Sequence, residues 1–242
     1  MAIVNASALS DPTILRLSLD AKAGVKVSPF SRKGRSRVKT EACDHDFHPQ
    51  ATITPYGIFL PQLDELFLYC TTSKVTSDFI ADVLEAWWLV HRQRFPAVQT
   101  LLLNQDNGPE NHSRRTQFMK RMVDFAQRHQ VNLRLAYHLP YHSKYNSIER
   151  TWGVLENHWN GNILDEIDTV LQFAHSMTWN GHHPVVKLVT QTYQTGVKLT
   201  QLAMAEVETQ IQRLAEFQVN DKPLNLGKWS IDIFYCPEPI LA

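Results

Sequence analysis

The sequence predicts an α/β fold in which helices flank a mixed β-sheet, and two patterns along the chain lead to this prediction. Up to residue 71, four segments have the alternation or the apolar character of β-strands. From residue 77 onward, helical and strand periods follow one another as helix, strand, helix, strand, helix. The chain has 242 residues, 43% hydrophobic and 20% charged, so it is long and apolar enough to bury the core of such a fold.

The first part of the chain predicts an antiparallel meander of strands at residues 14–19, 25–30, 51–59 and 66–71. In the first strand, Leu15, Leu17 and Leu19 alternate with polar residues, so one face is apolar. Asp20 therefore stands at the end of a strand.

The middle of the chain predicts helices and buried strands in alternation. An amphipathic helix begins at Ser77, which offers an N-cap, and continues to about residue 95. Residues 98–105 are typical of a strand buried on both faces, and Asp106 follows directly. A second helix covers residues 118–126, with Ser113 as its candidate cap, and a strand covers residues 131–139.

The last part begins with a helix that carries Ile148, Trp152, Leu155 and Trp159 on one face. We expect core packing rather than base stacking for the tryptophans of the predicted helices, which are Trp87, Trp88, Trp152 and Trp159.

Beyond residue 161, the pattern predicts a helix at 166–178, a strand at 229–235 and an amphipathic helix between them. The apolar face of that helix consists of Met204, Val207, Ile211 and Leu214. We expect residues 1–13 to be a short lead, residues 14–180 the main domain and residues 181–242 a small C-terminal extension packed on it.

The sequence excludes a membrane span, because its longest apolar runs are a few residues and a spanning helix needs ~18. The first ten residues carry no basic residue and so lack the start of a secretory signal. Cys43, Cys70 and Cys236 are odd in number and far apart, which favours free thiols in a reducing compartment. We expect a cytoplasmic protein.

Charge is balanced over the whole chain but not along it. The 24 basic and 24 acidic residues give a formal net charge of zero. Between residues 22 and 39, however, no acidic residue accompanies the basic ones, which are Lys22, Lys26, Arg32, Lys33, Arg35, Arg37 and Lys39. Such a stretch can contact a phosphate backbone, and the alternative is a solvated basic loop.

Three carboxylates stand at informative places: Asp20 and Asp106 at strand ends, and Glu149 in the first turn of a helix. If the two strands are neighbours and the helix crosses their ends, the three side chains converge. Such a cluster of hard oxygen ligands suits Mg²⁺ or Mn²⁺, and two such ions can catalyse phosphodiester displacement. Each residue also has a structural interpretation, because Asp20 and Asp106 fit turns and Glu149 fits a capping box with Asn146.

Two longer segments carry a family resemblance. Residues 103–111 (LNQDNGPEN) and 138–152 (HLPYHSKYNSIERTW) resemble the second and third motifs of DDE transposases, with the ISAzo13-type insertion-sequence family as the match. Residues 17–22 (LSLDAK), with Lys26 and residues 28–32 (SPFSR), are similar to the first motif. Residues 156–161, 183–186 and 193–199 also resemble this family, so the resemblance covers nearly the whole chain.

The resemblance implies an RNase H-like fold in which Asp20, Asp106 and Glu149 are the catalytic triad and hold Mg²⁺ or Mn²⁺, as two ions. It further implies hydrolysis at transposon ends and attack of the freed 3′-hydroxyl on target DNA. The partners are then transposon-end and target DNA and further copies of the chain, in a prokaryotic cytoplasm. Three residues flanking Glu149 are further candidates for DNA contact, namely His142, Lys144 and Arg150.

One feature departs from the family pattern. Transposases of this kind are expected to carry an N-terminal helix-turn-helix region, and about thirteen residues precede the first predicted strand. Two other functions therefore remain open. A ribonuclease or structure-specific nuclease would share the fold and the metals, and strand transfer of a pre-cleaved end separates it from a transposase. A truncated, non-catalytic remnant would bind metal and cleave no DNA.

Overall fold

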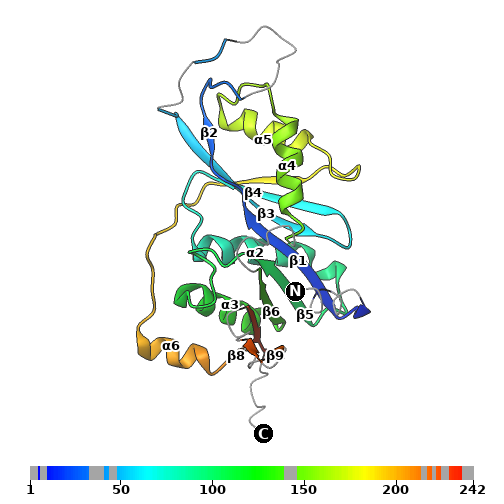
Figure 1. The fold of residues 1–242 in the computed structure, drawn as a ribbon, viewed down its shortest axis with the longest axis vertical. Coiled ribbons are helices and arrows are strands. Elements are labelled where there is room, and N and C mark those ends of the chain that lie inside the picture. The colour runs from blue at the N-terminus through cyan, green and yellow to red at the C-terminus, as the bar shows by residue number, and fades with distance from the viewer. Residues whose placement is uncertain are drawn as a thin grey trace. The chain divides into compact units, whose positions relative to one another are not determined.

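A computed structural model of the chain describes residues 5, 10–32, 41–43, 48–138, 146–213, 217–219, 222–224 and 229–235. The chain divides into two compact units (Figure 1). Unit 1 comprises Met1–Leu17, Thr76–Asn146 and Gln194–Ala242, and unit 2 comprises Ser18–Val75 and Ser147–Tyr193. Strand β1, Ile14–Ala21, contributes its first four residues to unit 1 and its last four to unit 2.

Unit 2 is built on a sheet with the strand order β7, β4, β3, β1. Strand β3 (Ala51–Leu60) pairs antiparallel with β1 and with β4 (Glu65–Thr71). The β3–β4 pair is as the predicted meander requires, whereas the meander would pair β1 with the strand predicted at residues 25–30. Strand β7 (Val185–Val189) pairs parallel with β4. The sequence does not predict β7, because its five residues follow Pro184 and show no polar–apolar alternation.

Strand β2 (Val25–Val27) does not form the separate meander strand that the sequence predicts. It pairs antiparallel with the start of β3, where Val25 opposes Ile53, whereas Ala21 of β1 opposes Tyr56 of the same strand. The backbone N–H of Lys22 still donates to the carbonyl of Pro55, at 2.9 Å. From Ala21 to Val25 the chain advances four residues, while their partners on β3, Tyr56 and Ile53, are three residues apart. The first strand therefore has one extra residue, a β-bulge, and β2 continues β1 beyond it.

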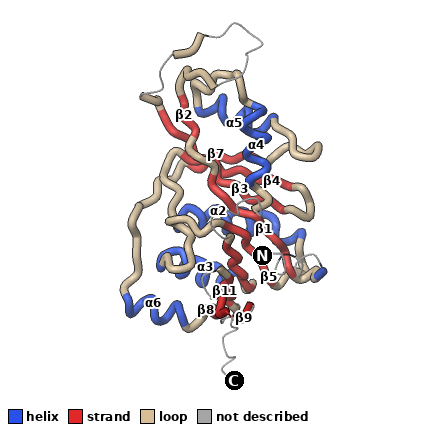
Figure 2. The backbone as a smooth tube through the Cα atoms, viewed as in Figure 1, coloured by secondary structure: helices blue, strands red, loops and turns tan. Residues whose placement is uncertain are grey.

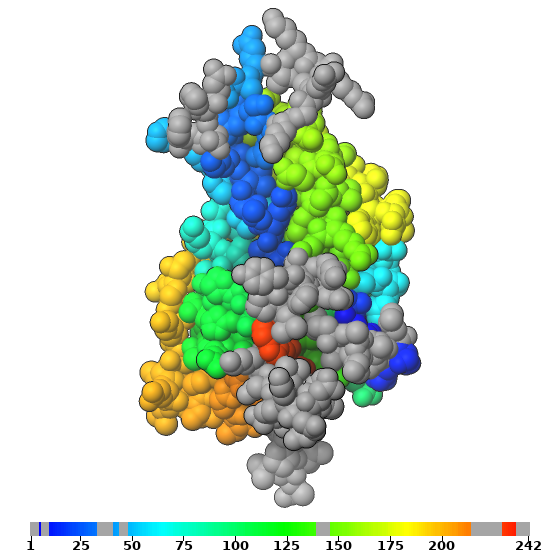
Figure 3. Space-filling model, viewed as in Figure 1, coloured from blue at the N-terminus to red at the C-terminus, as the bar shows by residue number. Residues whose placement is uncertain are grey.

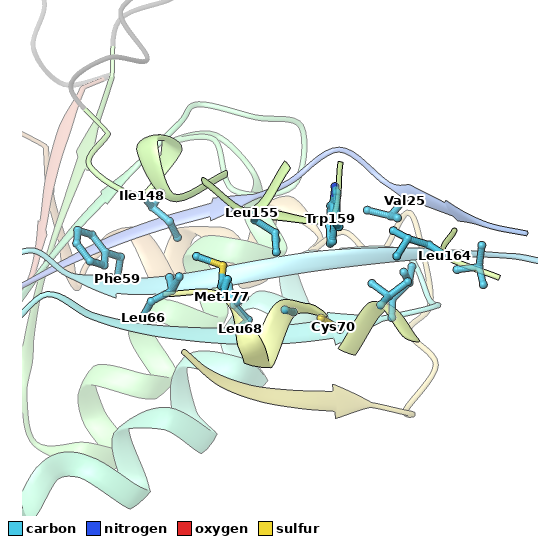
Figure 4. Close-up of a cluster of buried hydrophobic side chains, with 14 residues drawn as sticks. Val25, Phe59, Leu66, Leu68, Cys70, Ile148, Leu155, Trp159, Leu164 and Met177 are labelled. Carbon is cyan, nitrogen blue, oxygen red and sulfur yellow. The ribbon is translucent and has the colours of Figure 1, made fainter. Parts of the chain in front are cut away.

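Two helices cover this sheet, α4 (Glu149–His158) and α5 (Ile167–Ser176) (Figure 2). The space-filling view shows the yellow-green residues of α4 beside the blue residues of β1 and β2 (Figure 3). Apolar side chains of α4 point onto the strands, among them Ile148 just before the helix, Leu155 and Trp159 (Figure 4). All three are fully buried in a cluster with residues of β2, β3 and β4, which anchors α4 to these strands.

The strands of unit 1 continue the same sheet from β1, in the order β1, β5, β6, β11, β8. Strands β5 (Thr100–Gln105) and β6 (Asn132–Tyr137) pair parallel, and β11 (Ser230–Ile233) pairs antiparallel with β6 and with β8 (Ile211–Arg213). Two short strands, β9 (Phe217–Val219) and β10 (Lys222–Leu224), pair with each other. Strands β5, β6 and β11 are as predicted, with somewhat shorter bounds.

The helices of unit 1 are α2 (Ser77–His91), which continues into the 3₁₀ turn η1 (Arg92–Arg94), and α3 (Thr116–His129). The predicted caps are wrong. Thr76 caps α2 by accepting a hydrogen bond from the N–H of Phe79, while the Ser77 hydroxyl donates to the carbonyl of Glu110. Helix α3 begins after Arg115 without a side-chain cap, so Ser113 does not serve there.

The amphipathic helix predicted from Met204 to Leu214 is shorter than expected. Helix α6 is Gln201–Glu208, and Ile211 lies in β8, where it opposes Ile233 of β11. Pairing within the sheet therefore overrides the helical period at Ile211, and Leu214 lies outside the described residues.

Residues beyond 180 contribute β7 to unit 2 and β8 and β11 to unit 1. The predicted division into residues 1–13, 14–180 and 181–242 stays a prediction. The predicted class is confirmed: both units contain parallel and antiparallel strand pairs with helices packed on them. In the part of the chain that the structure describes, every helix is too short or too polar to cross a lipid bilayer.

Candidate active site

Asp20 lies near the end of β1, and its carboxylate is held by a tryptophan of α4. The indole N–H of Trp152 donates to Asp20 Oδ2 at 2.8 Å. Because side chains on one face of a strand are two residues apart, Ser18 shares this face with Asp20. The Ser18 hydroxyl accepts a hydrogen bond from the backbone N–H of Ile148, at 3.0 Å. Two side chains of β1 thus fix the first turn of α4.

The neighbouring strand leaves space for this contact. Gly57 of β3 is the register partner of Asp20. A Cβ atom at Gly57 would lie 2.4 Å from Cδ1 of Ile148 and 2.9 Å from Cη2 of Trp152, which is closer than real Cβ contacts come. Only glycine therefore lets the indole lie over the strand and reach Asp20.

Glu149 is the first residue of α4, three positions before Trp152 and on the same side of the helix. Ile148 is the N-cap residue and makes no side-chain cap, so the capping box with Asn146 is wrong. The backbone N–H of Ile148 donates to Ser18, and the helix starts two residues later than a cap at Asn146 requires. Unit 2 therefore brings Asp20 and the turn that carries Glu149 side by side.

Asp106 belongs to unit 1, where it directly follows β5 and is exposed. Its Oδ1 accepts a hydrogen bond from the amide of Asn111, at 2.9 Å. A Cβ at Gly108 would lie 2.9 Å from Asp106 Oδ2, so a larger residue there would shift the Asp106 carboxylate. The backbone N–H of Ser113 closes the loop by donating to Asn107 Oδ1, at 3.2 Å.

Two buried residues, Tyr137 and His138, form hydrogen bonds to the backbone of the loop that carries Asp106. The Tyr137 hydroxyl donates to the carbonyl of Asn111 at 2.9 Å, and burial raises the pKa of Tyr137 far above its usual value. The N–H of His138 donates to the carbonyl of Gln105, next to Asp106. Burial lowers the pKa of His138, against the opposing influence of Asp106, so its imidazole is neutral at pH 7.

The predicted cationic residues fall into two groups. Lys22, Lys26 and Arg32 lie in unit 2, and Arg150 is exposed on α4 next to Glu149. The remaining candidates lie outside the described residues, namely Lys33, Arg35, Arg37, His142 and Lys144.

The predicted core packing of the tryptophans is confirmed at three of the four positions. Trp87, Trp88 and Trp159 are buried, so their rings are not available for base stacking. Trp152 is half-buried, packs on the same apolar cluster as Trp159 and also bonds Asp20.

A family model described as the Rhodopirellula transposase DDE domain matches residues 4–224 of this chain. The chain belongs to this family. Among curated proteins, no sequence matches it. Two solved structures are similar, each at 10% identity over 71% of this chain: the Mos1 transposase paired-end complex with the left transposon end, with a TM-score of 0.49, and the Mos1 mariner paired-end complex with Mn, with a TM-score of 0.47. The chain spans about half the length of those two proteins, since it covers 50% of each.

In this DDE domain, Asp20 and Glu149 belong to unit 2, where Trp152 of α4 bonds Asp20, and Asp106 belongs to unit 1. Among the described residues, no group of three or more His, Cys, Asp and Glu side chains is arranged to hold a metal ion. The convergence of all three carboxylates stays a prediction. The donor set itself fits Mg²⁺ or Mn²⁺, because all three ligands are carboxylates and carry the hard oxygens that these ions prefer.

Sequence reasoning missed the residues that hold the carboxylates. Trp152 has the helical spacing of a core residue, and this pattern hides its hydrogen bond to Asp20. Asn111 and Ser18 lie in the segments that resemble the second and first motifs, but the resemblance assigns them no role. The one available signal was position: Trp152 follows Glu149 by three residues, so any group near Glu149 is also within reach of the indole.

Proposed function

We propose that this DDE domain is the catalytic domain of a DNA transposase that hydrolyses phosphodiester bonds at transposon ends and joins the freed 3′-hydroxyl to target DNA. The observation that carries the proposal is the Trp152–Asp20 hydrogen bond, which fixes one acidic residue of the family's motif beside the turn that carries another, Glu149. Family membership over residues 4–224 supports the same assignment.

We propose that Asp20, Asp106 and Glu149 together hold two divalent ions, Mg²⁺ or Mn²⁺. Such ions supply activation of the attacking oxygen and stabilisation of the leaving oxygen. The chain's own contribution is positioning: Trp152 orients the Asp20 carboxylate and Asn111 orients that of Asp106. In the hydrolytic step a water oxygen bonds to phosphorus, the bond to the 3′-oxygen breaks, and that oxygen takes up a proton.

The DNA contacts are proposed for the basic residues around this site. Lys22 follows β1 directly, and Lys26 and Arg32 come after the bulge, so the three can bind phosphates of the strand that reaches Asp20. Arg150 stands next to Glu149, and we assign His142, Lys144 and the remaining basic residues Lys33, Arg35 and Arg37 to the same role from the sequence. Because a transposon has two ends, we expect a homo-oligomer, acting on DNA in a prokaryotic cytoplasm.

The test is a cleavage and strand-transfer assay on labelled transposon-end DNA with Mg²⁺ or Mn²⁺. Asp106→Asn should abolish both reactions and keep the fold, because the change removes charge and keeps shape. Asp124→Asn on α3, which removes only the exposed ion pair with Lys120, is the matched control and should react like wild type. Full activity of Asp106→Asn would contradict the proposal. Hydrolysis without strand transfer would favour the nuclease, and metal binding without cleavage would favour the non-catalytic remnant.

A further inference from the structure

A pocket of about 710 Å³ opens within unit 2, between the bulge that joins β1 to β2 and the second half of α4. Its polar lining consists chiefly of Lys22, Lys26, Arg32, Glu156, Asn157 and Asn160. The bulge at residues 22–24 bends the chain where it lines the pocket. Figure 3 shows the blue residues of β1 and β2 beside the yellow-green residues of α4. The volume lies in the range of small-ligand sites, roughly 300–1,000 Å³.

Two cations of this pocket, Lys22 and Arg32, are held in fixed positions. Lys22 Nζ lies 2.8 Å from Glu156 Oε2 and 5.7 Å from the ring centroid of Trp159. The Arg32 guanidinium lies 5.8 Å from the same ring and donates to the carbonyl of Lys26 at 2.8 Å. Because Trp159 is fully buried, it is a rigid support for both. Cations that are already immobilised lose little entropy when an anion binds.

The charge of the pocket favours an anion. Three basic side chains face one carboxylate, Glu156, which is already paired with Lys22. Burial lowers the pKa of Arg32, yet an arginine stays protonated at neutral pH. On a nucleic acid, the anion that lysine and arginine bind is the phosphodiester of the backbone.

The amides of the pocket favour a base beside that phosphate. Asn157 and Asn160 each offer one acceptor and two donor hydrogens, the pattern that pairs with base edges. In a duplex the Watson–Crick edges are occupied, whereas an unpaired base presents them. Asn157 follows Glu149 by eight residues on α4, which is about 12 Å along the helix axis, or between three and four steps of a DNA strand at about 3.4 Å per step.

We propose that this pocket binds one unpaired nucleotide of the DNA substrate, three to four nucleotides from the phosphate at Asp20 and Glu149. Lys26 and Arg32 hold its phosphate, and the two asparagine amides hold its base. The proposal rests on the proposed function only in taking DNA as the substrate. It adds a preference for a single-stranded segment next to the site of reaction.

The first test compares two labelled DNAs by fluorescence anisotropy without divalent metal: a duplex with a short 3′ single-stranded extension, and a blunt duplex of the same sequence. Wild type should bind the extended DNA more tightly. The double variant Asn157→Ala, Asn160→Ala should lose about tenfold in affinity for the extended DNA, about 1.4 kcal/mol, and stay within about twofold on the blunt one. Arg92→Ala, an exposed arginine of η1 in unit 1, is the control and should change neither.

A second test uses Cys43, an exposed free thiol that lines the pocket. In a Cys236→Ser background, an oligonucleotide whose extension base carries a tether activated as an aryl disulfide should react with Cys43 by thiol–disulfide exchange, which releases the aryl thiol and leaves a mixed disulfide. Cys43→Ser should abolish this crosslink. Cys70 does not compete, because it is buried and its pKa is raised to about 12.

Equal wild-type affinity for the two DNAs, together with an unchanged double variant, would overturn the pocket assignment and leave the proposed function standing. Crosslinking that is as efficient from a paired base of the blunt duplex would overturn it as well. Failure of the wild-type chain to bind either DNA would instead contradict the proposed function.

Discussion

Trp152 is the residue whose change separates positioning from packing most clearly. Trp152→Phe keeps most of the ring in the apolar cluster and removes the N–H that bonds Asp20. Loss of a partner that orients a metal ligand typically costs about 10- to 100-fold in metal affinity or activity, and we expect a loss in that range. Isothermal titration with Mn²⁺ measures it. Trp88→Phe, a buried tryptophan of α2 in the other unit, is the control: it should lower the melting temperature without changing Mn²⁺ affinity. Unchanged Mn²⁺ affinity in Trp152→Phe would show that the indole only fills space.

His138 predicts a pH dependence of stability. Its pKa is lowered in the folded state by burial, with a smaller lowering by Arg16 and opposing contributions from Asn146 and Asp106. The unfolded chain therefore binds a proton first as pH falls below about 6.5, and the stability that neutral His138 provides is lost below that value. Between pH 7.5 and 5.5, the melting temperature of wild type should fall further than that of His138→Asn. Each kcal/mol lost from the free energy of unfolding lowers the melting temperature by about 2–4 °C. Parallel pH profiles for the two proteins would contradict this.

At the scale of elements, the approach of α4 to β3 depends on Gly57. Gly57→Ala would place a Cβ against Ile148 and Trp152, and Ile148 is fully buried, so it has no room to move. We expect a loss of about 1–3 kcal/mol in the free energy of unfolding and weaker Mn²⁺ binding through displacement of Trp152. Gly153→Ala in the same helix is the control, because a Cβ there meets nothing within 4 Å and alanine favours a helix. Denaturant unfolding of both variants gives the comparison, and equal stability of Gly57→Ala and wild type would refute the close approach.

The sequence predicts elements whose pattern is local and misses those that depend on distant partners. β1, β3, β4, β5 and β6 follow from alternation or apolar runs, and Asp20 and Asp106 stand at their ends as predicted. The errors arise where tertiary contacts decide. Ile211 joins a strand because it opposes Ile233, and the start of α4 is set by Ser18, a residue 130 positions away from Ile148. The contact from Trp152 to Asp20 spans 132 positions, and no local pattern reports it.

At the scale of the whole molecule, a net charge of zero means that DNA binding must come from the distribution of charge. We expect binding to weaken steeply with salt, with a slope that falls by roughly one for each phosphate-contacting cation removed. The variant with Arg32, Lys33, Arg35 and Arg37 changed to Ala should show a weaker affinity and a shallower slope in anisotropy titrations, while Mn²⁺ binding stays intact. A wild-type affinity and slope in this variant would place the DNA path elsewhere.

The central proposal is that Asp20, Asp106 and Glu149 bind the same divalent ions. Mn²⁺ binding by isothermal titration to wild type and to Asp20→Asn, Asp106→Asn and Glu149→Gln tests it most directly, with Asp124→Asn as control. The account predicts that each of the three changes weakens Mn²⁺ binding by at least about tenfold, about 1.4 kcal/mol, and that the control does not. Mn²⁺ binding to Asp106→Asn as tight as to wild type, with loss in the other two variants, would contradict a metal site shared by the three carboxylates.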